Sequence, residues 1–318
     1  MKKLCLWMMM LSLCVISVNA STVAYWRFEE GPAGAQVPKT TPGITWEPST
    51  ADSSGNGYAL SVWDEGGAGY IYRSDKAYST VPLSGQTNNY SVKNSGGGPA
   101  MWTETGAGIQ TWSPSAWTIE ATFKLENGGY KTIVGRDSIG SVTQGDNPDG
   151  NLAAMYFQAV PNNGLAIKFC DVSGYWHEAI SAENAYVGFN WSPENPDGDP
   201  ATPWYSMAAT SDGTTLSLYL NEIGTGAWNL IAQTDLSLSG SPDTALTPGT
   251  GDGGDWDAGN FTVGRGLYGG GHGDRAYGFL DEIRLSDTAL AVDEFLVPEP
   301  ATMVLFGLGS LVALKRRK

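Results

Sequence analysis

The chain has few carboxylates at the spacing that hydrolysis of a glycosidic bond requires. A retaining glycosidase holds two carboxyl groups about 5–5.5 Å apart across the bond. In residues 117–125, Glu120 is followed by Thr122 at the position where a strand would bring the next side chain to the same face. Asp281 and Glu282 are adjacent, so in a regular strand they would point to opposite faces. We therefore predict that the protein is not an enzyme and that it has no catalytic residues.

Other kinds of nucleophilic chemistry find little support. His177 and His272 are the only histidines, and the chain has no Gly-x-Ser-x-Gly motif. His272 lies in a glycine-rich run, so we expect a solvated loop histidine, with a ligand role as the alternative. Cys170 ends an apolar run, and we predict that it is buried as a small apolar residue.

Three loops combine Asp, Asn and Gly, which are the residue types that supply oxygen ligands to calcium. These loops are residues 146–151, 195–199 and 252–257. None of them matches the EF-hand pattern, which requires a Glu at its twelfth position. We interpret all three as solvated acidic loops, with cation binding as the alternative.

Aromatic side chains near the predicted loops favour glycan binding, because sugar rings stack on Trp and Tyr. The tryptophans in or beside loops are Trp46, Trp63, Trp102, Trp112, Trp191, Trp204 and Trp256. From this set we select as candidate ligand-binding residues Trp63, Trp102, Trp191 and Trp256. Trp26 and Trp117 lie in alternating runs, so we predict that they belong to the core.

Composition points to strands and turns. Of 318 residues, 42 are Gly, and only 16% are charged. Residues 21–297 contain 12 basic and 32 acidic residues, a net charge of −20. Such a surface repels phosphate backbones, so we expect no nucleic-acid partner. Cations and neutral glycans stay plausible as partners.

Short runs that alternate apolar and polar residues recur between Gly, Pro, Asn and Asp, as in antiparallel sheets. The predicted strands are residues 22–28, 117–125, 131–135, 152–158, 165–170, 176–180, 204–210, 215–220, 229–233, 259–264 and 277–285. Their number and spacing predict an all-β fold with two packed antiparallel sheets. We expect residues 84–114 to be loose and only residues 288–295 to be helical.

The first 20 residues have the pattern of a secretory signal peptide. Lys2 and Lys3 precede an apolar run, which closes at Ala20 after Val18 and Asn19. An uncleaved membrane anchor is the alternative, although the run is shorter than the roughly 20 residues that a spanning helix needs. Signal peptidase would leave Cys170 as the one cysteine, so the exported chain forms no internal disulfide.

The other end of the chain carries a sorting motif. Pro298, Glu299 and Pro300 precede 14 uncharged residues (301–314) and a basic cluster at 315–318. This order resembles the PEP-CTERM signal of Gram-negative bacteria. The resemblance implies recognition by an exosortase, with the short apolar helix as a transient inner-membrane tether before release to the cell surface or extracellular matrix. A permanent anchor is the alternative, and basic residues favour the cytoplasmic side in either case.

Four pieces of the body of the chain form a set in a fixed order: residues 23–31 (VAYWRFEEG), 52–57 (DSSGNG), 117–125 (WTIEATFKL) and 278–290, which begins GFLDEIRL. Together they resemble a LamG-like jelly roll of the concanavalin A-like lectin and glucanase superfamily. Ala291 stands where the family usually has a capping Ser, so we expect a weaker helix start there. The resemblance implies an all-β, concanavalin A-like jelly-roll sandwich over residues 21–297, between a signal peptide (1–20) and a sorting signal (298–318).

The same resemblance implies a structural calcium ion that ties the first strand to the last. The matching positions are Glu29 (with Glu30 as its alternative), Asp52, Asn56 and Asp281. A simple hairpin turn is the alternative reading of residues 52–57, because Asn-Gly is a turn signal by itself.

Fold alone does not give function in such a superfamily. We predict an exported, non-catalytic protein of the cell surface or exopolysaccharide that binds a polysaccharide or a surface protein. Two alternatives stay open: a glycoside hydrolase or lyase with an unrecognised site, and a structural matrix protein without a specific ligand.

Overall fold

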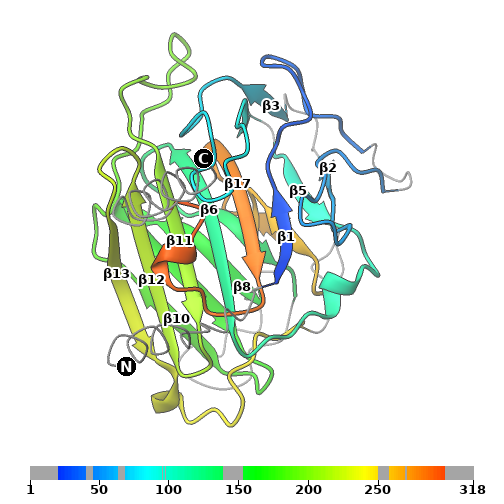
Figure 1. Cartoon of the computed structure of the whole chain (residues 1–318), viewed down its shortest axis with the longest axis vertical. Helices are drawn as coiled ribbons and strands as arrows, with labels where there is room; N and C mark the ends of the chain where they lie inside the picture. The colour runs from blue at the N-terminus through cyan, green and yellow to red at the C-terminus, as the bar shows by residue number, and fades with distance from the viewer. Residues whose placement is uncertain are drawn as a thin grey trace, which may run out of the picture.

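The computed structural model describes residues 21–40, 46–63, 69–94, 96, 98–138, 153–249, 258–268 and 271–297. Two large antiparallel sheets pack face to face in this part of the chain (Figure 1). The predicted all-β sandwich is therefore confirmed. The signal segment and the apolar C-terminal helix lie outside the described residues. Among the residues that are described, no helix has the length and apolarity needed to cross a membrane.

The larger sheet has eight strands. They are β1 (Thr22–Trp26), β3 (Tyr70–Arg73), β4 (Ser91–Asn94), β6 (Trp117–Leu125), β11 (Tyr205–Ser211), β12 (Thr215–Glu222), β13 (Trp228–Asp235) and β17 (Gly278–Ser286). The strand order is β13-β12-β11-β6-β17-β4-β3, and β1 also pairs with β17. The first strand of the sandwich therefore pairs with its last.

The smaller sheet has seven strands. They are β2 (Leu60–Trp63), β5 (Ala100–Thr103), β7 (Lys131–Arg136), β8 (Met155–Val160), β9 (Gly164–Cys170), β10 (Trp176–Ile180) and β14 (Phe261–Val263). Their order is β10-β9-β8-β7-β14-β5-β2. A small hairpin of β15 (Gly266–Tyr268) and β16 (Gly271–Gly273) is separate from both sheets.

The core lies between the two sheets, where alternate residues of each strand meet. Trp117 of β6 packs edge-on against Phe169 of β9, with ring centroids 5.4 Å apart. Phe123 stacks on Tyr205 at 5.8 Å and meets Tyr186 edge-on. Trp26 is also fully buried, so both tryptophans that the sequence places in the core lie there.

The outer face of the larger sheet is covered as well. Asp75, from the chain between β3 and β4, forms an ion pair of 3.0 Å with Lys124 of β6. The C-terminal segment also crosses this face, where Leu296 N–H donates to the Glu120 carboxylate at 2.7 Å. All nine residues of β6 are consequently buried, including its charged ones.

The predicted strands agree best with the longest elements. The bounds of β6 and β10 match the prediction, whereas β2, β3, β4 and β5, of four residues each, were not predicted. Residues 84–114, expected to be loose, contain β4, β5 and the 3₁₀ turn η1 (Gly108–Thr111). Residues 288–295 form only the single 3₁₀ turn η4 (Val292–Glu294), in which Ala291 provides no side-chain cap.

Removal of the Phe123 ring tests the packing between the sheets. Phe123→Ala should lower the free energy of unfolding by about 3–5 kcal/mol, because the ring is fully buried between two tyrosines. Urea denaturation followed by tryptophan fluorescence measures this change. Leu238→Ala is the control, since Leu238 is 83% exposed and should change stability by less than about 0.5 kcal/mol. Equal effects of the two substitutions would contradict the packing described.

Candidate functional site

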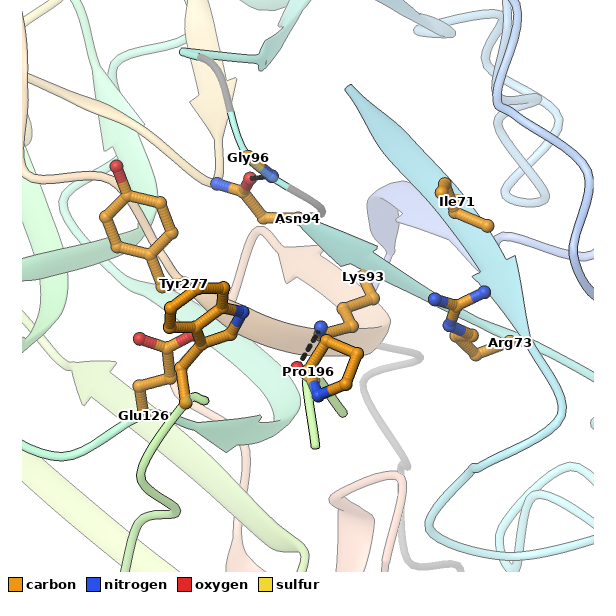
Figure 2. A pocket seen from close by; sticks show the side chains of 9 residues that line it. Ile71, Arg73, Lys93, Asn94, Gly96, Glu126, Pro196 and Tyr277 are labelled. Carbon is orange, nitrogen blue, oxygen red and sulfur yellow. Dashed lines mark hydrogen bonds between the residues drawn. The ribbon is translucent and has the colours of Figure 1, made fainter. Parts of the chain in front are cut away.

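A pocket of about 530 Å³ opens on the outer side of the larger sheet, at its β3 edge. We call it the Trp191 pocket. Its lining includes Arg73, Lys93, Asn94, Glu126, Trp191 and Tyr277. Figure 2 shows Glu126 and Tyr277 on one side of the pocket, Arg73 on the other and Lys93 between them.

The pairing of β3 with β4 positions the polar side of this pocket. Ile71 lies opposite Lys93, while the neighbouring Tyr70, Tyr72 and Val92 point into the core. Alternation along the strands therefore turns Ile71, Arg73 and Lys93 outward. This pattern is visible in the sequence at residues 70–73 as Tyr-Ile-Tyr-Arg, but the run is too short to stand out among the turns.

Two basic side chains hold the loop before β11 over the sheet. Asp197 of this loop forms ion pairs with Lys93 at 3.1 Å and with Arg73 at 3.3 Å. The Lys93 ammonium also donates to the carbonyl of Pro196 and lies 5.7 Å from the centre of the Phe279 ring. One exposed carboxylate thus joins two strands of the sheet to the loop that carries Trp191.

Two donors in the pocket wall have no hydrogen-bond partner among the described residues, namely Arg73 Nε and Asn94 Nδ2, and both atoms are buried. Trp191 is 55% exposed, so its ring offers a flat apolar surface to solvent. Glu126 adds an acceptor, and burial raises the pKa of its carboxyl group. An exposed aromatic ring in a pocket that is lined by basic, amide and carboxylate side chains can hold a polyhydroxylated ring.

The four candidate tryptophans do not converge. Trp191 lines the pocket, whereas Trp63 and Trp102 pack with Trp46 and Ala100 on the smaller sheet. Trp63 lies 5.5 Å from the Arg265 guanidinium. Trp256 lies outside the described residues. Ligand binding by Trp63, Trp102 and Trp256 stays a prediction.

Arg73, Lys93 and Asn94 are pocket residues that were not predicted from the sequence. Each lies on a four-residue strand that was not predicted, and their convergence with Trp191 depends on pairing across the fold.

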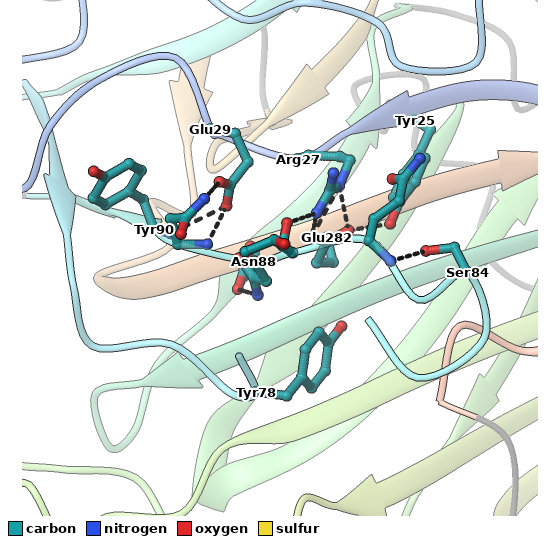
Figure 3. A network of polar contacts seen from close by, with 12 residues as sticks. Tyr25, Arg27, Glu29, Tyr78, Ser84, Asn88, Tyr90 and Glu282 are labelled. Carbon is teal, nitrogen blue, oxygen red and sulfur yellow. Dashed lines mark hydrogen bonds and ion pairs between the residues drawn. The ribbon is translucent and has the colours of Figure 1, made fainter. Parts of the chain in front are cut away.

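A buried acidic network lies elsewhere on the same outer face (Figure 3). Asp281 and Glu282 were expected to point to opposite faces, and this expectation is wrong. A β-bulge between Asp281 and Arg284, with Glu282 at φ 47°, leaves Leu280 and Ile283 in the core and turns both carboxylates outward.

Each carboxylate of the bulge has its own partners. Glu282 accepts from the Tyr25 hydroxyl and forms a 3.0 Å ion pair with Arg27. Asp281 accepts from Asn88 Nδ2 at 2.8 Å. Burial first, and the Glu282 charge second, raise the pKa of Asp281 well above its ordinary value. Both carboxylates are fully buried, so a polysaccharide has no access to them in this arrangement.

The residues expected to bind calcium have mostly other partners. Asp52 accepts four hydrogen bonds, from the backbone N–H groups of Tyr25, Ser54 and Tyr58 and from the Ser54 hydroxyl. Asn56 donates to the carbonyls of Thr22 and Val23. Glu29 accepts from the backbone N–H groups of Asn89 and Tyr90 and from the Asn89 side chain. These bonds fasten two turns to the chain around β1.

Asp281 is the one member of that set with an unsatisfied oxygen. Asp281 Oδ1 and the neighbouring Asn88 Oδ1 are buried and have no partner among the described residues. In that part of the chain, no three His, Cys, Asp or Glu side chains gather in a group that could hold a metal. The four predicted ligands thus do not converge on one ion, and the calcium site stays a prediction.

Both histidines and Cys170 have buried side chains that contact other parts of the fold. His272 was expected in a solvated loop, which is wrong, because it lies in β16 and contacts Asp137 at 3.0 Å in a buried pair. His177 contacts Asp171 at 2.7 Å. Cys170 is fully buried as predicted, and burial raises the pKa of its thiol to about 12.

Substitution of Asp281 tests the effect of the buried carboxylate on stability. A folded-state pKa above the unfolded value means that the folded protein holds the proton more tightly. Stability contributed by this group is therefore lost as pH rises from about 4 through the folded pKa. In EDTA, the melting temperature of Asp281→Asn should therefore change less between pH 4 and 8 than that of the parent protein. An equal change in melting temperature with pH for the two proteins would contradict this.

The C-terminal end of the chain matches the PEP-CTERM protein-sorting motif over residues 296–318. This finding confirms the predicted sorting signal and marks the chain as an exported, surface-directed protein. The match covers well under half of the chain, so it does not classify the sandwich. A search of curated protein sequences finds no match.

Solved structures similar to this chain are β-sandwich domains. The ligand-binding domain of botulinum neurotoxin serotype D, in complex with N-acetylneuraminic acid, is 10% identical, with a TM-score of 0.45 over 85% of this chain and 48% of that one. The CBM40 domain of Ruminococcus gnavus IT-sialidase, bound to α2,6-sialyllactose, is 15% identical, with a TM-score of 0.42 over 61% and 87%. A leech intramolecular trans-sialidase is 16% identical, with a TM-score of 0.42 over 61% and 24%.

The chain spans about half the length of the neurotoxin binding domain that it matches. Likeness at this level assigns no ligand to this chain, and the LamG-like resemblance stays a prediction.

Proposed function

We propose that this protein is a non-catalytic glycan-binding protein of the cell surface or exopolysaccharide, and that a sugar ring binds in the Trp191 pocket. The observation that carries the proposal is the exposed Trp191 ring in a pocket that is also lined by the polar side chains of Arg73, Asn94 and Glu126. Sugar rings stack on exposed aromatic rings, and polar side chains beside the ring can bond to sugar hydroxyls.

The shape of the pocket supports a ligand of sugar size. Its volume of about 530 Å³ falls in the 300–1,000 Å³ range of small-molecule sites. Trp191 supplies the apolar contact, and Glu126 supplies an acceptor for hydroxyl donors. The two ion pairs of Asp197 hold the loop in place before ligand arrives, which reduces the entropy lost on binding.

The absence of catalysis is part of the proposal. Of the candidate catalytic carboxylates, Asp281 and Glu282 are sealed beneath the chain between β3 and β4, and Glu120 is ion-paired with Arg284. None of these three lines the Trp191 pocket. A sugar bound there would therefore meet Glu126 without a second carboxylate from this set.

The sorting motif supports the remaining steps of the proposal. We propose that signal peptidase removes residues 1–20 and that an exosortase acts at Pro298, Glu299 and Pro300. Residues 301–314 would serve as a transient tether in the inner membrane, and residues 21–297 would reach the exterior of a Gram-negative bacterium.

Substitution of Trp191 tests the function. Trp191→Ala should weaken retardation in gels that contain laminarin, xylan, arabinogalactan or alginate by about tenfold or more in apparent affinity, because the stacking surface is lost. Trp191→Phe keeps an aromatic ring and should retain most of the binding. Equal retardation of the parent protein and Trp191→Ala by every polymer would contradict the proposal, as would no retardation of the parent protein.

Of the four predicted calcium ligands, Asp281 has a buried oxygen that is still available for a cation. Asp281 Oδ1 and Asn88 Oδ1 are buried oxygens without partners, and hard cations take oxygen ligands. We propose that a calcium ion stabilises the fold through Asp281. EDTA at pH 7 should then lower the melting temperature of the parent protein, while Asp281→Asn should show no such change. An unchanged melt of the parent protein in EDTA would overturn this proposal.

A further inference from the structure

A second pocket, of about 360 Å³, lies on the smaller sheet. We call it the Tyr268 pocket. It is lined by Tyr130, Tyr156, Gln158, Lys168, Trp176, Tyr268 and Asp274. Four of these seven side chains are aromatic, and they come from β8, β10, the β15 strand of the small hairpin and the chain before β7.

Alternation along the strands places this pocket on the outer face of the smaller sheet. Phe157 and Ile167 point into the core between the sheets. Their neighbours Tyr156 and Lys168, which are register partners, therefore point outward. Because Lys93 and Ile71 point outward from the larger sheet, the two pockets lie on opposite faces of the sandwich.

The base of the Tyr268 pocket is rigidly built. The Tyr156 hydroxyl donates to the Leu267 carbonyl and accepts from Ala153 N–H, which fastens the β15–β16 hairpin over the sheet. Trp176 packs edge-on against the Tyr156 ring, with centroids 6.0 Å apart. The aromatic floor is thus in place without a ligand.

The rim of the pocket offers what a pyranose ring requires. Tyr130 and Tyr268 are 51% and 58% exposed, so two rings are available for stacking. The Trp176 ring lines the pocket beside them and adds apolar surface. Gln158 and Asp274 add polar groups for sugar hydroxyls.

We infer that the Tyr268 pocket is a second, independent binding site for the pyranose rings of a polysaccharide. With sites on opposite faces, one molecule can hold two polymer chains and cross-link them. This inference rests on the proposed function of the Trp191 pocket for its cross-linking step, while sugar binding at the Tyr268 pocket stands on its own residues. Two sites also raise the apparent affinity for one long polymer through effective concentration.

Cross-linking can be measured separately from binding. The parent protein is mixed with soluble laminarin, xylan, arabinogalactan or alginate, and turbidity is recorded against the ratio of protein to polymer. Retardation in gels containing the same polymer measures binding. The variants are Tyr268→Ala, Trp176→Ala, Trp191→Ala and the Tyr268→Ala/Trp191→Ala pair. Tyr268→Phe keeps the ring, and Leu238→Ala changes an exposed residue that lines neither pocket.

The inference predicts a distinct pattern. The parent protein, Tyr268→Phe and Leu238→Ala should give turbidity that peaks at an intermediate ratio and falls with excess protein. The three single-pocket variants should lose the turbidity, yet still be retarded with about tenfold lower apparent affinity, because avidity is lost. The double variant should lose both.

Three results would overturn the inference. They are unchanged turbidity and retardation for Tyr268→Ala and Trp176→Ala, no retardation at all for Trp191→Ala, and no turbidity from the parent protein with a polymer whose retardation both Trp191→Ala and Tyr268→Ala weaken. Failure of the proposed function looks different. In that case Trp191→Ala would be retarded like the parent protein, while Tyr268→Ala alone would abolish retardation.

Discussion

The pairing of β17 with β6 in the middle of the larger sheet is the constraint on which the other elements depend. β17 also pairs with β1 and β4, so the first and last strands of the sandwich and the edge that bears the Trp191 pocket all take their register from it. The bulge at Glu282 lies in this strand and turns two carboxylates onto one face. The chain between β3 and β4 then has to cover them, which it does through Asn88 and Tyr78.

Burial of both faces of β6 explains where binding can occur. Asp75 and the C-terminal segment cover the centre of the larger sheet, and the Trp191 pocket opens away from that centre, over β3 and β4. On the smaller sheet, the exposed rings of Tyr130 and Tyr268 border the Tyr268 pocket, which lies beside the small hairpin. The two pockets thus lie on different sheets and away from the covered centre of the larger one.

Sequence patterns predicted the long, regular elements and missed the short ones. Nine-residue β6 carries its alternation in full, whereas β3 and β4 have four residues each and are recognisable only through their pairing. Trp191 was predicted as a binding residue because a tryptophan in a loop is a residue type on which sugar rings stack. Arg73 and Asn94 were missed because their role depends on contacts between distant segments. The shared face of Asp281 and Glu282 depends on a bulge, which a period of two residues does not reveal.

Hydrogen–deuterium exchange in the presence of an oligosaccharide, prepared from whichever polymer retards the protein most, tests the central claim most directly. The account predicts slower exchange in the peptides that contain Trp191 and Asn94, because a bound sugar would cover the Trp191 loop and the end of β4. Exchange that slows elsewhere on the sandwich, with these two peptides unchanged under saturating oligosaccharide, would contradict sugar binding in the Trp191 pocket.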